Sequence, residues 1–93
     1  MIKSWAAKET RKLFEGKASR IPTDLQKRAL SKLQAIHAAP SLETLGKVPG
    51  NELESLSGDR QGQHSIRINV QYRVCFRWEN GDAYEVEVID YHG

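Results

Sequence analysis

Three adjacent residues near the end of the sequence, Asp90, Tyr91 and His92, carry side chains that can transfer protons. Imidazole exchanges protons near neutral pH, and a neighbouring carboxylate or phenol can orient it or share the transfer. Two arginines, Arg67 and Arg73, precede this group, and their forks can hold a phosphate and offset developing charge. Because RNA supplies its own nucleophile, the 2′-hydroxyl, these groups can cleave a phosphodiester without a metal or a serine. The set indicates a ribonuclease site, with an idle, solvated histidine as the alternative interpretation.

Other polar residues support weaker hypotheses. His64 opens an expected strand, where a surface histidine and a functional contact both stay open. Arg60 lies in an expected turn at 58–60 and can still reach a substrate. Cys75 lacks an activating partner, so we do not expect its thiol pKa to be lowered. Three scattered histidines and one cysteine do not have a metal-ligand spacing, so we expect no metal or cofactor.

The chain of 93 residues fits one domain, residues 1–93, and carries a net charge of +2. No run approaches the roughly 20 apolar residues of a membrane helix, and no signal core is visible, which predicts a cytoplasmic protein. The charge is uneven: residues 1–50 carry ten basic and four acidic side chains, and residues 51–93 carry four and eight. This asymmetry leaves open both a nucleic-acid partner and an ordinary solvated face.

Helical patterns fill the first half of the sequence. Residues 8–15 predict a short helix ended by Gly16. Thr23 and Gln26 have the spacing of a capping box, and the helix they open is closed by Pro40. Its apolar side chains recur at helical intervals, which predicts a buried stripe. These side chains are Leu25, Ala29, Leu30, Leu33 and Ile36.

The period changes to two in the second half, where apolar residues occupy even positions from Ile66 to Trp78. Strands average about 5–6 residues, so we predict two strands joined by a three-residue turn at 69–71, which keeps one face apolar. This register pairs Arg67 with Arg73 on the other face, where directly opposed like charges repel. A purely structural sheet does not require such a pair, so the register favours a binding role.

A second hairpin follows, with Asn80-Gly81 as a strong turn signal. A two-residue turn would place valines of the last strand on the arginine face. A three-residue loop with a bulge keeps the apolar face continuous, with Tyr84 opposite Trp78, and we favour it. Glu85 then pairs with Arg77, which we interpret as a structural ion pair. The sequence thus predicts an α+β fold, an antiparallel sheet with one face covered by the amphipathic helix. Residues 2–6 also alternate and are compatible with a short strand.

Several motifs occur together and in order across essentially the whole chain. They are Pro49-Gly50-Asn51-x-Leu53-Glu54-x-Leu56, Gly58-Asp59-Arg60-x-Gly62, Ser65-Ile66-Arg67-Ile68-Asn69, Gln71-Tyr72-Arg73-Val74-Cys75-Phe76-x-Trp78 and Val88-x-Asp90-Tyr91-His92. With this set the chain resembles the HigB family of toxins, within the RelE/ParE superfamily. The resemblance implies two main N-terminal helices packed on one face of a small antiparallel β-sheet, in agreement with the independent reading of the periodicity.

The resemblance also implies a function. Family members are bacterial toxins of type II toxin–antitoxin systems that enter the A site of the 70S ribosome and cut mRNA, which stops translation and growth. The implied mechanism is metal-independent attack by the 2′-hydroxyl. The family's functional positions fall on Arg73, Asp90, Tyr91 and His92, with His92 as general acid/base, Asp90 as its partner or a proton acceptor, and Arg73 as a phosphate holder. The implied partner is a HigA-like helix-turn-helix antitoxin, through which alone the toxin would meet DNA.

One departure and two alternatives accompany the resemblance. Glu54 and Ser57 stand in a segment where some members carry a histidine and a lysine, so we expect weaker cleavage, with Glu54 still able to act as a base. Arg67, Arg60 and His64 join Glu54 as the candidate RNA-binding residues. The alternatives are a ParE-like inhibitor of DNA gyrase and a weakly active or inactive RNA-binding relative. The acid/base set near residue 91 favours the ribonuclease.

Overall fold

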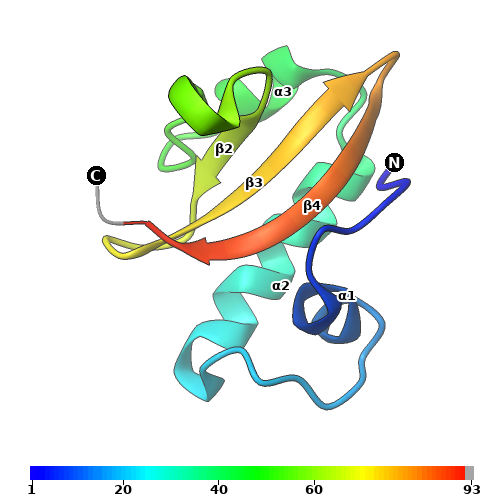
Figure 1. Cartoon of the computed structure of the whole chain (residues 1–93), viewed down its shortest axis with the longest axis vertical. Coiled ribbons are helices and arrows are strands. Elements are labelled where there is room, and N and C mark those ends of the chain that lie inside the picture. Colours follow the sequence, from blue (N-terminus) through cyan, green and yellow to red (C-terminus); the bar gives the residue numbers. More distant parts are fainter. Residues whose placement is uncertain (92–93) are drawn as a thin grey trace.

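The computed structural model describes residues 1–91 and contains one antiparallel sheet with helices on one side (Figure 1). The strand order is β1-β2-β3-β4. The elements in chain order are α1 (Lys8–Phe14), α2 (Thr23–Ala38), α3 (Leu42–Gly46), β1 (Glu54–Ser55), the 3₁₀ turn η1 (Gly58–Arg60), β2 (His64–Arg67), β3 (Tyr72–Glu79) and β4 (Asp82–Asp90). The predicted α+β fold is therefore confirmed.

The core lies between the sheet and the α1/α2 layer. The predicted stripe of α2 faces the even-numbered residues of the strands, because successive strand side chains point to opposite faces. The fully buried side chains of this layer include Leu33, Ile36, Ile66, Val74, Phe76 and Val86. In Figure 1 the η1 turn lies on the viewer's side of the sheet, and α2 lies behind it. Within residues 1–91, no helix has the length and hydropathy needed to cross a membrane.

Helix α2 begins differently from the prediction. Thr23 is its first helical residue, and the capping position is Pro22, whose side chain makes no cap bond. The Gln26 side-chain amide donates to the carbonyl oxygens of Ser19 and Ile21, at 3.2 and 2.8 Å. The capping box is therefore wrong, because a threonine with helical backbone cannot also take the extended conformation of the cap residue. Gln26 instead fastens the preceding loop to the helix.

The first hairpin has the predicted register. Ile66 pairs with Val74, and Arg67 pairs with Arg73. The Asn69 side-chain oxygen accepts hydrogen bonds from two backbone N–H groups of the turn, both at 2.8 Å. An asparagine that bonds its own turn in this way stabilises the reversal locally. The turn therefore fixes the offset that brings the two arginines together.

The second hairpin corrects one detail of the prediction. Its loop has two residues, Asn80-Gly81, with φ angles of 50° and 83°, the left-handed pair that suits a two-residue hairpin turn. Tyr84 consequently pairs with Arg77, not with Trp78. The extra residue appears further along, at Glu85, which has a φ of 53° and lies where the ladder register shifts. This bulge restores the predicted register for the rest of β4, and the expected Arg77–Glu85 ion pair forms at 2.5 Å.

Residues 1–6 lie along the outer edge of β4 without forming a continuous strand. Two parallel bridges join Ile2 to Ala83 and Trp5 to Val86, and the bulge at Glu85 separates them. The Lys3 N–H donates to the Ala83 carbonyl at 2.8 Å. Beyond these bridges, the Thr10 side chain of α1 accepts the Val88 N–H at 3.0 Å. The edge of β4 is therefore occupied by the N-terminal segment and α1.

Candidate active site

Two adjoining hollows share Tyr91 as a wall, and both lie toward the sheet face that carries Arg67 and Arg73. The first, the Glu54 pocket, has a volume of about 490 Å³. It is lined by Glu54, Ser55, Leu56, Ser57, Asp59, Arg60 and Tyr91. The second, the Arg73 pocket, has a volume of about 330 Å³. It is lined by Glu52, Arg67, Asn69, Val70, Arg73 and Tyr91.

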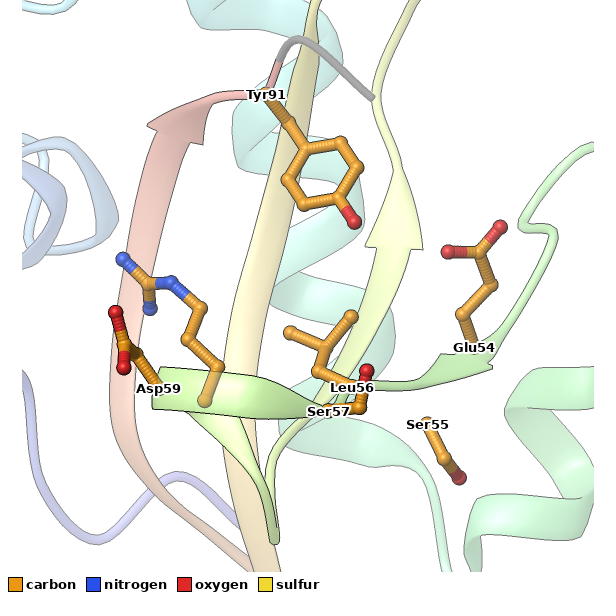
Figure 2. Close-up of a pocket in the computed structure, with 7 residues that line it drawn as sticks. Glu54, Ser55, Leu56, Ser57, Asp59 and Tyr91 are labelled. Carbon is orange, nitrogen blue, oxygen red and sulfur yellow. The ribbon is translucent and has the colours of Figure 1, made fainter.

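Figure 2 shows how the Glu54 pocket is arranged. The Tyr91 hydroxyl and the Glu54 carboxylate point into the space between the end of β4 and the β1 segment. Glu54 pairs with Ser65 across β1 and β2, so its side chain belongs to the same sheet face as Ser65. A carboxylate and a phenol that share one pocket can both bond a ribose or a base, and the carboxylate can also take a proton.

Arg73 is the most confined charge of the site, with only 8% of its surface exposed. Its Nε donates to the Ser65 hydroxyl at 2.7 Å, and its Nη2 donates to the backbone carbonyls of Ser65 and Glu52. Among residues 1–91, these acceptors are all neutral. The Tyr91 ring lies over the guanidinium, with 6.0 Å between Cζ and the ring centroid. Arg73 is thus a fixed cation, and no carboxylate within residues 1–91 forms an ion pair with it. Such a cation is suited to binding a phosphate.

Glu52 relates the two arginines to each other. Its backbone is left-handed, with a φ of 43°, a conformation that non-glycine residues rarely adopt. The Glu52 carbonyl accepts from Arg73, and its carboxylate lies 3.2 Å from Nη1 of Arg67. Arg67 also donates through Nε to the Asn69 carbonyl at 3.1 Å. One residue therefore offsets the repulsion between two arginines that the strand register places opposite each other.

Asn51 anchors Glu52 to the rest of the fold and is 1% exposed. Its side-chain oxygen accepts from Lys32 Nζ of α2 at 2.5 Å, and its Nδ2 donates to the Leu45 carbonyl at 3.0 Å. Its own carbonyl accepts the Arg67 N–H at 2.7 Å. Sequence reasoning missed Asn51 and Glu52 as site residues. The available signal was an asparagine directly after Pro-Gly, since such side chains commonly bond the backbone of a turn.

Two members of the predicted acid/base group, Asp90 and Tyr91, lie where β4 ends. Asp90 is the last residue of the strand, and its Oδ2 accepts from the Gln71 side chain at 3.0 Å. The Tyr91 N–H donates to the Gln71 carbonyl at 2.6 Å, which holds the tyrosine at the pocket wall. Gln71 of the first turn therefore positions both residues. His92 lies outside the described residues.

The structure separates the two remaining candidates. Arg60 borders the Glu54 pocket, donates to the Gln63 side chain at 3.0 Å and lies 3.7 Å from the Glu87 carboxylate. His64 pairs with Phe76, and the two ring centroids lie 6.2 Å apart. This places His64 on the helix-covered face, where burial lowers the pKa of its imidazole. Arg60 therefore joins the cleft, and His64 does not border either pocket.

Cys75 is fully buried opposite Glu87, and burial raises the pKa of its thiol to about 11. This confirms the expectation that its thiol pKa is not lowered, and a neutral thiol is a poor nucleophile. Residues 1–91 contain no group of three or more His, Cys, Asp or Glu side chains placed to hold a metal ion.

Solved structures define the class of this fold. A YafQ mutant from E. coli superposes with a TM-score of 0.64 at 9% sequence identity, covering 97% of this chain and 91% of that one. The YoeB toxin of the heterotetrameric YoeB–YefM complex from Staphylococcus aureus gives a TM-score of 0.61 at 15% identity, covering 100% and 99%. The fold is that of the RelE-like toxins, as the sequence resemblance implied.

Sequence comparisons narrow the class to one family. The family described as the RelE-like toxin of type II toxin-antitoxin system HigB matches residues 3–92. Endoribonuclease HigB of Proteus vulgaris is 39% identical over 93 residues, covering 99% of this chain and 100% of that protein. Toxin HigB-1 of Vibrio cholerae is 40% identical over 63 residues, covering 68% and 66%. The chain belongs to the HigB-like toxin family, and as a type II toxin it has an antitoxin partner.

Proposed function

We propose that this HigB-like endoribonuclease cuts mRNA in the ribosomal A site by attack of the 2′-hydroxyl on the adjacent phosphate. Its full-length similarity to Endoribonuclease HigB supports the endoribonuclease activity. The environment of Arg73 is the main structural support for the proposed site. Arg73 is a nearly buried cation, and within residues 1–91 it is bound only to neutral acceptors. Such a group can hold a phosphate and stabilise the extra negative charge of the transition state without having to reorganise.

The two pockets divide the substrate between them. The scissile phosphate binds at Arg73 and Arg67 in the Arg73 pocket, and the neighbouring nucleotide enters the Glu54 pocket across Tyr91. Glu54 takes the proton of the 2′-hydroxyl, the 2′-oxygen bonds to phosphorus and the bond from phosphorus to the 5′-oxygen breaks. His92, supported by Asp90, returns a proton to the leaving 5′-oxygen. The products are a 2′,3′-cyclic phosphate and a 5′-hydroxyl end.

The Glu54 carboxylate sets the rate of this reaction. It is exposed and lies beside a cleft that must accept a polyanion, so it repels the phosphates on either side of the one being cut. Family members with a histidine and a lysine in this segment do not carry this penalty. We therefore propose slow cleavage with the same reaction class.

The partners follow from the charge distribution. Residues 1–50, which form all three helices, contain ten of the fourteen basic side chains, and this cationic layer contacts ribosomal RNA through its phosphates. The antitoxin is HigA-like, with a helix-turn-helix domain that supplies the DNA contact of the complex. The toxin and its targets meet in the cytoplasm.

The test is primer extension on a defined mRNA after brief induction of the toxin. The variants are Glu54→Gln, whose exposed site leaves the fold intact, and the double variant Arg73→Ala, His92→Ala. Arg77→Ala is the matched control, since Arg77 is an ion-paired arginine that borders neither pocket. We expect new 5′ ends at in-frame codons with the natural protein and with Arg77→Ala. These 5′ ends should appear only in the presence of ribosomes. Their amount should fall at least about 100-fold with Glu54→Gln, and the double variant should produce none.

Growth arrest with intact mRNA would contradict the proposal. That result would favour the gyrase-inhibitor alternative, which a supercoiling assay checks directly. Cleavage that is unchanged in the double variant would instead place the reaction elsewhere on the protein. Circular dichroism of each variant distinguishes lost chemistry from lost folding.

A further inference from the structure

A third hollow continues the cleft beyond Arg67 toward helix α2. Its volume is about 340 Å³. We call it the Arg28 pocket, and it is lined by Arg28, Gly50, Arg67, Ile68, Asn69 and Val70. It shares Arg67, Asn69 and Val70 with the Arg73 pocket, which in turn shares Tyr91 with the Glu54 pocket. The three hollows therefore form one series with Arg67 and Tyr91 as the dividing walls.

The Arg28 pocket is cationic. Arg28 is exposed on α2, and no carboxylate of residues 1–91 forms an ion pair with it. Arg67 pairs with Glu52, a residue that lines the Arg73 pocket and not this one. Two arginines from different elements thus line one hollow, and its lining contains no acidic residue. Arginine forks match a phosphate better than lysine does, and such a groove can follow a nucleic-acid backbone.

Val70 adds an apolar contact between the two arginine hollows. It is 87% exposed at the end of the first hairpin turn and lines both the Arg73 and the Arg28 pockets. The Asn69 side chain holds this turn through two backbone hydrogen bonds. An exposed hydrophobic residue on a well-fixed turn, flanked by arginines, can cover the face of a base while the arginines hold its phosphates.

We propose that the Arg28 pocket binds a further phosphate of single-stranded RNA, beyond the nucleotides at the cleavage point, with Arg28 as its distal ligand. This inference rests on the proposed ribonuclease function and extends the substrate by one binding subsite. RNA is favoured over an acidic protein segment because the pocket is continuous with the cleft that holds Arg73. An RNA strand bound at Arg73 must extend out of the cleft in some direction. The Arg28 pocket continues the cleft on the Arg67 side, so it lies on one possible path of the strand.

Fluorescence anisotropy with RNA that cannot be cut tests the subsite. A core dinucleotide with a 2′-deoxy sugar at the cleavage point is lengthened one nucleotide at a time, on the 5′ side in one series and the 3′ side in the other. We expect affinity to rise along one series with the natural protein and to stop rising with Arg28→Gln. The slope of log affinity against log salt for the longer oligonucleotides falls by about 0.7, the value of one phosphate contact on a single strand. Arg28→Lys retains that slope.

Lys27→Gln is the matched control, because Lys27 is the exposed neighbour on α2 and lines none of the three hollows. Equal losses for Lys27→Gln and Arg28→Gln would overturn the subsite, as would an Arg28→Gln effect that does not depend on RNA length. Weakened antitoxin binding with unchanged RNA binding would overturn it in favour of a protein interface. Failure of the proposed function is distinct, because the core dinucleotide would then bind the natural protein and Arg73→Ala equally.

Discussion

Arg67 and Arg73 occupy directly opposed positions of β2 and β3, and both guanidiniums contact the same residue, Glu52. Glu52 offers its carboxylate to Arg67 and its carbonyl to Arg73, and its backbone is left-handed, with a φ of 43°. The three residues together retain one net positive charge. The strand register therefore places two arginines opposite each other, and within residues 1–91 a carboxylate pairs with only one of them.

Glu52→Gln removes this carboxylate and keeps the carbonyl contact. The Arg67–Glu52 pair is solvent-exposed, so we expect the free energy of unfolding to change by less than about 1 kcal/mol. Affinity for single-stranded RNA should rise, because Arg67 no longer shares its charge. Urea denaturation and fluorescence anisotropy measure the two effects. Glu85→Gln is the control, since it removes the equivalent carboxylate from Arg77 outside the cleft. Unchanged RNA affinity in Glu52→Gln would show that Arg67 does not contact the strand.

Arg73→Ala should destabilise the protein as well as inactivate it. The change leaves the buried Ser65 hydroxyl without its donor, which costs about 1–3 kcal/mol. Arg73→Lys keeps the charge and lacks the fork, so we expect intermediate stability with cleavage still reduced about 100-fold or more. Urea denaturation and ribosome-dependent cleavage test the pair. Full activity in Arg73→Lys would show that charge alone, without the geometry of the fork, holds the phosphate.

Asn51→Ala should uncouple the cleft from the helices. The Leu45 carbonyl loses its donor and Lys32 Nζ loses its acceptor, so we expect unfolding to become easier by about 1–3 kcal/mol. Cleavage should also fall, because Asn51 anchors Glu52, and Glu52 contacts both Arg67 and Arg73. Lys32→Met removes only one of the two side-chain bonds and should show the smaller loss. Denaturant midpoints that are equal for Asn51→Ala and the natural protein would refute this role.

Gly62→Ala and Gly58→Ala separate backbone strain from steric contact. Both glycines have left-handed φ angles, 91° and 64°, so alanine is strained at each by about 1 kcal/mol or more. At Gly62 a Cβ would also lie 2.8 Å from Arg77 Nη1, whereas at Gly58 no atom lies within 4 Å. Arg77 Nη1 is the far end of a flexible side chain that can move aside at little cost, so we expect both variants to lower the melting temperature by similar amounts. A clearly lower melting temperature for Gly62→Ala, removed by Arg77→Ala, would show that the ion pair with Glu85 holds Arg77 in place.

Alkaline pH should destabilise the protein through Cys75. Burial raises its thiol pKa from 9.0 to about 11, so between these values the unfolded chain releases its proton first and stability falls as pH rises. The loss amounts to about 2–3 kcal/mol. Cys75→Ala has no thiol and therefore does not undergo this loss. The difference in the free energy of unfolding between the natural protein and Cys75→Ala should therefore shrink between pH 8 and pH 11. Urea denaturation at both pH values measures this, and a constant deficit would contradict it.

Periodicity predicted the long helix, the first hairpin and the Arg67–Arg73 pairing, because each depends on contacts that repeat along a single element. The position of the bulge was not predictable in this way. The Asn80-Gly81 turn fixes a two-residue loop, and the compensating residue at Glu85 lies where residues 1–6 meet β4. That choice depends on a segment about eighty positions away in the sequence, which no local pattern reports.

The residues of the cleft also differ in how far the sequence predicts them. Arg67, Arg73 and Tyr91 were found from residue type and strand register. Asn51 and Glu52 were not, since their roles arise from contacts with α2, α3 and two strands at once. Burial of an amide and a left-handed glutamate are properties of the assembled structure. Residues whose role depends on contacts from several elements therefore need the fold, whereas Arg67, Arg73 and Tyr91 were visible from residue type and strand register.

The pairing of residues 1–6 with Ala83 and Val86 affects when the protein can fold during its synthesis. Residues 1–6 are made about eighty positions before Ala83 and Val86, so they must wait for these backbone partners. Such contacts between distant parts of a chain slow folding. The pockets at Tyr91 also stay incomplete until β4 has been synthesised. The cleft therefore assembles only after β4, which follows the helices and the other strands in the chain, has been made.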